Sequence, residues 1–69
     1  MRVVAEVLPG RREETVLLDD APKGLDLLRA LRLAPDAHVL IREGLPIPAD
    51  EPLVEGERIH VIRIVSGGS

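Results

Sequence analysis

Apolar and polar side chains alternate in two runs near the start of the chain. In residues 2–8 every second residue from Val3 onward is apolar, which predicts a β-strand with one buried face. Pro9-Gly10 ends this run, and residues 14–18 form a second β-rich run after a polar stretch. We therefore expect an antiparallel hairpin whose loop is longer than two residues.

The next apolar pattern has the spacing of a helix, with leucines along one arc and charged residues on the other side. The pair Asp19-Asp20 before Pro22 marks its start, because a carboxylate can accept bonds from free backbone N–H groups and proline is tolerated in the first turn. We expect this helix over residues 22–32, packed on a sheet. Gly24 costs up to about 1 kcal/mol relative to alanine within a helix, so either the first turn frays or the glycine permits close packing.

The second half of the chain predicts three more extended segments. Residues 38–42 read as a strand, and the segment 45–48 contains two prolines, so it is a short edge piece or irregular. In the loop that follows, we expect the side chains of Leu53 and Val54 to pack into the core. The run 58–65 is the longest β-rich segment, and its isoleucines predict the buried centre of the sheet.

The order of elements is strand, strand, helix, strand, short edge and strand. If the first and last strands lie parallel and side by side at the centre, with the helix across one face, the result is an α+β, β-grasp fold with a mixed sheet of four to five strands. We expect one domain over residues 1–65. The tail 66–69 has no apolar anchor, so we expect it to be mobile.

The composition removes several classes of function. The 69 residues include no cysteine, which excludes a disulfide, a thiolate zinc site and a cysteine nucleophile. A net charge of −3 and the absence of aromatic rings argue against nucleic acid as a partner, because bases find neither a basic stripe nor a stacking surface. No run is apolar enough for a membrane span, and no signal-peptide pattern follows Met1, which favours a cytoplasmic protein.

The two histidines, His38 and His60, raise the question of a catalytic base or a metal pair. Strand residues of this kind are more typical of half-exposed surface positions. No Ser-His-Asp or His-x-x-x-His spacing accompanies them. We therefore expect neither a metal site nor an enzyme.

Three features of the second half carry a resemblance. They are residues 36–44 with Pro48, the acidic-Gly-acidic turn 55–57 followed by an apolar strand, and the terminal Gly67-Gly68. With these features the chain resembles the ubiquitin-like sulfur-carrier family, which includes the small carrier proteins of thiamine and molybdopterin biosynthesis and the archaeal small modifier proteins. The likeness covers nearly the whole chain. A Gly-Gly pair is common in loops, but one that follows a strand at the chain end is much more specific.

The resemblance implies that Gly67 and Gly68 form an activated C-terminus. An adenylating enzyme of the ubiquitin-activating type draws the Gly68 carboxylate through a narrow channel to its ATP, and residues without side chains fit such a channel. Sulfur then displaces AMP and gives a thiocarboxylate, which donates sulfur to an accepting enzyme in cofactor biosynthesis or tRNA thiolation. On this interpretation the chain is not itself an enzyme, needs no cofactor of its own and is a monomer when alone.

Two alternatives stay open. In the first, the chain is a ubiquitin-like protein modifier joined through Gly68 to lysines of target proteins; since its only lysine is Lys23, it could form chains only there or at its amino terminus. In the second, it is a β-grasp interaction module with an inert tail. Ser69 departs from the family pattern. It is removed by a processing protease, it was introduced in cloning, or the chain is never activated, and we favour the first two explanations over the third.

The resemblance to ubiquitin itself points to a docking patch. Ile41, His60 and Ile62 match positions of ubiquitin's apolar recognition patch, and we expect them to bind a partner. Ile59 would then face the helix from the opposite side of the same strand. The alternative is that these residues complete a thin core, with Leu40 facing outward and Ile41 inward.

Overall fold

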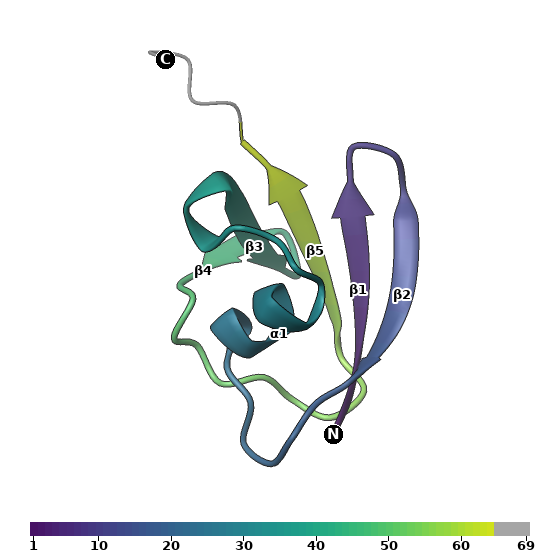
Figure 1. The fold of residues 1–69 in the computed structure, drawn as a ribbon, viewed down its shortest axis with the longest axis vertical. Coiled ribbons are helices and arrows are strands. Elements are labelled where there is room, and N and C mark those ends of the chain that lie inside the picture. Colours follow the sequence, from purple (N-terminus) through teal and green to yellow (C-terminus); the bar gives the residue numbers. More distant parts are fainter. Residues whose placement is uncertain (65–69) are drawn as a thin grey trace.

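The computed structural model describes residues 1–64. In this part the chain forms five strands, one α-helix and one 3-10 helix (Figure 1). Their bounds are β1 Arg2–Leu8, β2 Arg12–Leu17, α1 Gly24–Ala30, η1 Pro35–Ala37, β3 His38–Arg42, β4 Leu45–Ile47 and β5 Arg58–Arg63.

Most of the expected strands are confirmed. The strands predicted over 2–8 and 38–42 have the expected bounds, and β4 is a short edge strand. The hairpin between β1 and β2 is antiparallel, with a loop longer than two residues, although β2 begins earlier than expected, at Arg12. β5 ends at Arg63, and the predicted tail 66–69 lies outside the described residues.

The five strands form one mixed sheet in the order β2-β1-β5-β3-β4. β1 and β5 run parallel, and each other neighbouring pair is antiparallel. Figure 1 shows α1 lying across one face of this sheet. The architecture is the expected α+β, β-grasp fold, and β5 occupies the centre of the sheet as its apolar sequence predicted.

The core lies between α1 and the inner face of the sheet, which is the face turned toward the helix. The parallel register sets Ala5 beside Ile59, and the antiparallel register sets Leu40 beside Val61. All four side chains are buried because alternation along each strand turns them to the same face. The buried core consists of Val3, Ala5, Leu27, Leu28, Leu40, Leu53, Ile59 and Val61.

The loop before β5 contributes one of its two expected core residues. Leu53 is buried, but the side chain of Val54 is 60% exposed, so the prediction for Val54 was wrong. The Leu53 N–H donates to the carbonyl of Pro22 at 2.9 Å, which ties this segment to the start of the helix. Successive residues of an extended segment point to opposite sides, so the contact that buries Leu53 turns Val54 outward.

The start of α1 differs from the prediction. The helix begins at Gly24, and its N-cap is Lys23, whose backbone N–H donates to a carboxylate oxygen of Asp26 at 2.8 Å. The predicted cap at Asp19-Asp20 is wrong, because Ala21 adopts a left-handed backbone with a φ of 52° between the aspartates and the helix. At its other end α1 stops at Ala30, short of the expected residue 32.

Gly24 brings the start of α1 close to the sheet. A Cβ at this position would collide with Cδ1 of Leu40 and would lie 3.2 Å from the carbonyl oxygen of Ala49. The Gly24 N–H donates to the Glu51 carbonyl at 3.0 Å, and the Leu25 N–H donates to the Ala49 carbonyl at 2.7 Å. Loop carbonyls thus accept hydrogen bonds from the N–H groups that an acidic cap was expected to satisfy. Close packing against Leu40 and Ala49 explains why a glycine, rather than a larger residue, occupies this position.

Arg42 joins β3 to the loop before β5. Its guanidinium pairs with both carboxylate oxygens of Glu57, at 2.8 and 2.9 Å, and donates to Glu51 Oε2 at 2.9 Å and to the Pro52 carbonyl at 2.9 Å. Burial acts to raise the pKa of Glu57, but hydrogen bonds from Arg42 and the Val54 N–H outweigh it and lower that pKa. We call Arg42, Glu51 and Glu57 the arginine clamp; bidentate pairing of this kind fixes geometry as well as charge.

Candidate functional site

The two glycines that carry the predicted chemistry, Gly67 and Gly68, lie outside the described residues. The structure describes the segment that leads to them. β5 ends at Arg63, and the Ile64 N–H donates to the Ala37 carbonyl at 2.9 Å. Because β5 is paired on both sides, the position of Ile64 is fixed relative to the rest of the domain.

The three residues of the predicted docking patch lie together on the outer face, which is the sheet face turned away from α1. Ile41 is the antiparallel partner of His60, and Ile62 follows on the same face of β5. All three side chains are half-buried. Leu40 is buried on the inner face, so the alternative in which Leu40 faces outward and Ile41 inward is wrong.

Sequence reasoning missed two members of this apolar surface. Leu8 is the parallel partner of Ile62, and Val39 is the antiparallel partner of the same residue; both are half-buried. Alternation shows which residues of one strand share a face but not the register between two strands. The first and last strands were expected to be neighbours, but their observed register was needed to set Leu8 beside Ile62. We call the five residues the outer patch: Leu8, Val39, Ile41, His60 and Ile62.

Charged residues beside the outer patch hold His60 in place. Its Nε2 lies 3.1 Å from Glu6 Oε1, and an Arg58 Nη1 lies 3.4 Å from the same oxygen. Arg58 also hydrogen-bonds Glu13, and this bond raises the pKa of Arg58. We call Glu13, Arg58, Glu6 and His60 the ionic row. An aliphatic centre beside a polar border is typical of protein–protein contact surfaces.

The two histidines have separate partners. His38 Nδ1 lies 2.8 Å from the Ala34 carbonyl oxygen, and His60 pairs with Glu6 on the outer face. Residues 1–64 contain no group of three or more His, Cys, Asp or Glu side chains that could hold a metal ion. Over the same part of the chain, no helix has the length and apolar character needed to cross a bilayer.

Known proteins resemble either nearly the whole chain or a large part of it. Residues 1–65 match the family described as small archaeal modifier protein 2. The small archaeal modifier protein 2 of Haloferax volcanii is 37% identical over 68 residues, which are 99% of this chain and 100% of that protein. An uncharacterized protein of Archaeoglobus fulgidus is 33% identical over 43 residues, which are 62% of this chain and 63% of that protein.

Two solved structures share the fold. The crystal structure of SAMP1 from Haloferax volcanii has a TM-score of 0.76 at 20% identity and covers 99% of this chain and 100% of its own. The UBL domain of Plasmodium falciparum Dsk2 has a TM-score of 0.72 at 22% identity and covers 91% of this chain and 96% of its own. At these identities the likeness concerns the fold alone, and it confirms the β-grasp architecture.

Proposed function

The chain belongs to the small archaeal modifier protein 2 family, and we propose that it is a ubiquitin-like sulfur carrier that works through its C-terminal glycines. In this proposal a protease removes Ser69, an adenylating partner of the ubiquitin-activating type activates the Gly68 carboxylate, and sulfur replaces the activating group. The observation that carries the proposal is the position of Gly67-Gly68, shortly after the central strand of a ubiquitin-like fold.

A carboxylate must be activated before sulfur can replace one of its oxygens. A Gly68 oxygen attacks the α-phosphorus of ATP, an oxygen–phosphorus bond forms, and pyrophosphate leaves. Hydrosulfide then attacks the carbonyl carbon, a carbon–sulfur bond forms, AMP leaves, and a proton is released. The product is a thiocarboxylate that donates its sulfur in cofactor biosynthesis or tRNA thiolation.

The partner supplies the ATP site and the catalytic groups for both steps, which we place in the cytoplasm. The carrier supplies the acyl terminus. Gly67 and Gly68 suit this role because a backbone without side chains can enter a narrow channel. The absence of cysteine supports the terminal carboxylate as the point of sulfur attachment, since no side-chain thiol is available to hold the sulfur.

We propose the outer patch as the surface that binds the adenylating partner, with Ile41, His60 and Ile62 at its centre. Two features support this: its aliphatic side chains gather on an open sheet face, and β5 contributes to the patch and also leads to the tail. A partner seated on the patch therefore lies beside the start of the tail.

The Ile62→Asp variant tests the patch. We expect it to weaken binding to the host's adenylating enzyme by at least about tenfold in calorimetry, because a charge replaces a central apolar contact. Its far-UV circular dichroism spectrum stays that of the wild type, since Ile62 is only half-buried. Thr15→Asp, on exposed β2, is the matched control and keeps full affinity. Unfolding of Ile62→Asp would show instead that the residue belongs to the core.

The name of the relatives, modifier protein, favours a second outcome of the same activation. In this outcome the amine of a target lysine attacks the Gly68 carbonyl carbon, an amide bond forms, and AMP leaves. Within the chain itself, Lys23 is exposed at the N-cap of α1, whereas the Met1 ammonium donates to the Leu18 carbonyl at 2.7 Å. Conjugates of the protein with itself would therefore form at Lys23.

Intact-mass spectrometry separates the two outcomes. The chain ending at Gly68 is incubated with ATP, sulfide and the host's adenylating enzyme. Exchange of one oxygen for sulfur supports the carrier, and larger conjugates formed in a host extract support the modifier. A chain ending at Gly68 that undergoes neither change would overturn both proposals and leave an interaction module. The full chain ending at Ser69, with no protease added, is the control and stays unmodified.

A further inference from the structure

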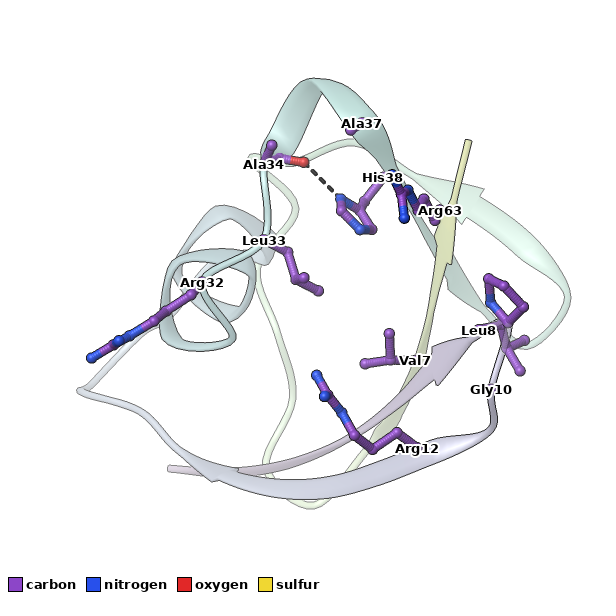
Figure 2. A pocket seen from close by; sticks show the side chains of 11 residues that line it. Val7, Leu8, Gly10, Arg12, Arg32, Leu33, Ala34, Ala37, His38 and Arg63 are labelled. Atoms are coloured by element: carbon purple, nitrogen blue, oxygen red, sulfur yellow. Dashed lines mark hydrogen bonds between the residues drawn. The ribbon is translucent and has the colours of Figure 1, made fainter. Parts of the chain in front are cut away.

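A cavity of about 600 Å³ lies at the end of the sheet where β1 and β5 both finish (Figure 2). One wall comes from the β1–β2 hairpin, and the other comes from the segment between α1 and β3. Val7 pairs with the buried Val61, so its side chain lies on the inner face of the sheet. Because Val7 lines the cavity, the cavity opens on the helix side of the sheet. The outer patch lies on the opposite face, and Leu8, at the end of β1, is the one residue that belongs to the patch and also lines the cavity.

The cavity combines an apolar floor with cationic groups. Val7 and Leu33 pack against the core and form the floor. Figure 2 shows the side chains of Arg12 and His38 projecting into the space from different walls, with Arg63 near His38. Among the described residues none of those that line it is acidic, although the chain as a whole carries a net charge of −3. The lining is therefore opposite in charge to the molecule.

The two projecting groups can both bind an anion. His38 Nδ1 lies 2.8 Å from the Ala34 carbonyl oxygen, which can only accept, so Nδ1 carries a proton and donates it there. Nε2 is left for a ligand: it accepts a hydrogen bond from a protonated carboxyl group, and it donates one to a carboxylate in the imidazolium form. Arg12 Nε pairs with Glu14 at 3.0 Å. That pair is exposed and contributes little, and it leaves the terminal Nη donors of Arg12 for a ligand.

We propose that this cationic cavity binds a carboxylate and the aliphatic group next to it, both carried by an acidic segment of the adenylating partner. The carboxylate lies between Arg12 and His38, since a guanidinium takes a carboxylate through two parallel hydrogen bonds. The aliphatic group packs on Val7 and Leu33. Both the charge and the apolar floor are thereby matched, which a bare anion would not achieve.

The location supports this choice of partner, and the inference rests on the proposed function. Arg63 is the last residue of β5, so the cavity lies where the chain runs on toward Gly68. A protein that takes hold of the Gly68 carboxylate has to approach this end of the sheet. With the outer patch on one face and the cationic cavity on the other, the partner contacts both faces of the end it must reach.

Ligand binding is tested by NMR titration of the full chain with 4-methylpentanoate, which joins a carboxylate to a branched aliphatic group. We expect the resonances of His38, Val7 and Leu33 to shift, and Arg12→Gln to weaken binding at least about tenfold. Arg32→Gln is the matched control: Arg32 lines the cavity and the variant loses the same charge, but in Figure 2 its guanidinium points away from the space. This control binds like the wild type.

Three results would overturn the ligand assignment. They are unmoved cavity resonances, equal weakening by both arginine variants, and binding of inorganic phosphate or of 4-methylpentanol as tight as that of 4-methylpentanoate. The first two remove the site, and the third removes the joint recognition of charge and aliphatic group.

The partner is tested by calorimetry with the host's adenylating enzyme. We expect Arg12→Gln to bind about tenfold more weakly and Arg32→Gln to bind normally. Adenylation is measured with the wild-type chain ending at Gly68. If both variants bind like the wild type while that chain is adenylated, the partner assignment is wrong and the proposed function stands. If the chain ending at Gly68 is not adenylated, the proposed function fails, and a positive titration with 4-methylpentanoate still supports the cavity as a carboxylate site.

Discussion

The two faces of the sheet are built from the same strands, yet similar residues have different surroundings on each. On β5, Ile59 is fully buried beneath α1, whereas Ile62 is half-buried on the outer face. The two paired arginines differ in the same way. The Arg42 side chain, on the side of β3 shared by Leu40, is 23% exposed, and the Arg58 side chain on the outer face is 50% exposed.

This contrast separates folding from binding. A domain without aromatic residues must build its core from branched aliphatic side chains, and the inner face buries them. The outer face keeps aliphatic side chains that folding leaves half-buried, and these are the side chains that we propose contact the partner. The face on which a residue lies, more than its type, therefore sets the effect of a substitution.

The largest expected effect is on the inner face. Ile59→Ala should lower the free energy of unfolding by about 3 kcal/mol, because it removes three buried carbons and leaves a cavity beneath α1. Urea denaturation followed by circular dichroism measures the loss. A loss of only about 1 kcal/mol, the value expected for a half-buried isoleucine such as Ile62, would show that the two faces contribute equally to the free energy of unfolding.

Replacing the two arginines is the next sharpest test. Arg42→Met should lower the free energy of unfolding by about 2 kcal/mol, because Glu57 loses its bidentate partner in a partly buried site. Arg58→Met should leave the urea midpoint unchanged, since exposed ion pairs are screened by water. Equal midpoints for the two variants would contradict the distinction between the faces.

Acid should weaken the inner arginine clamp. The pKa of Glu57 is lower in the folded protein than its ordinary value of 4.5. As the pH falls, Glu57 is therefore protonated more readily in the unfolded chain than in the folded protein, and acid favours unfolding. The stabilisation is thus fully present above pH 4.5 and is lost as the pH falls through the lower folded value. Urea midpoints between pH 7 and pH 3 should fall less steeply for Glu57→Gln than for the wild type. Glu43→Gln, on an exposed turn, is the control and should follow the wild type.

The smallest expected change in stability is on the outer face. Ile62→Ala should lower the free energy of unfolding by about 1 kcal/mol, since its side chain is already half in water. The same variant should lose more affinity for the adenylating enzyme than Ile59→Ala does under conditions where both are folded. If Ile59→Ala lost more affinity than Ile62→Ala, the outer patch would not be the binding surface.

The sequence predicted those parts of the fold that depend on local pattern. β1 and β3 have the expected bounds because apolar alternation and the turns that end it are both local signals. The start of α1 was missed since it depends on contacts of Gly24 and Leu25 with loop carbonyls far along the chain. The acidic pair at Asp19-Asp20 is a real capping signal, but the chain turns at Ala21 before any helix begins.

In the candidate site too, local pattern predicted some residues, whereas others depend on contacts between distant parts of the chain. Ile41, His60 and Ile62 were placed on one face by alternation together with the resemblance to ubiquitin, and the strand register brings them together. Leu8 and the cationic cavity could not be found in this way. The parallel pairing of β1 and β5 was expected, but both features depend on the exact register of this contact between the two ends of the domain, which no local pattern encodes.

That contact between the ends also determines when the protein can fold. β5 joins β1 to β3, so a nascent chain that stops before Arg58 holds α1 and two separate hairpins, β1–β2 and β3–β4, with no strand to join the hairpins into one sheet. Hairpins alone are marginally stable in water, so the complete sheet forms only after β5 has been translated. A product that terminates before β5 thus lacks the folded domain along with its glycines, and under the proposed function it cannot compete with the full-length protein for the adenylating partner.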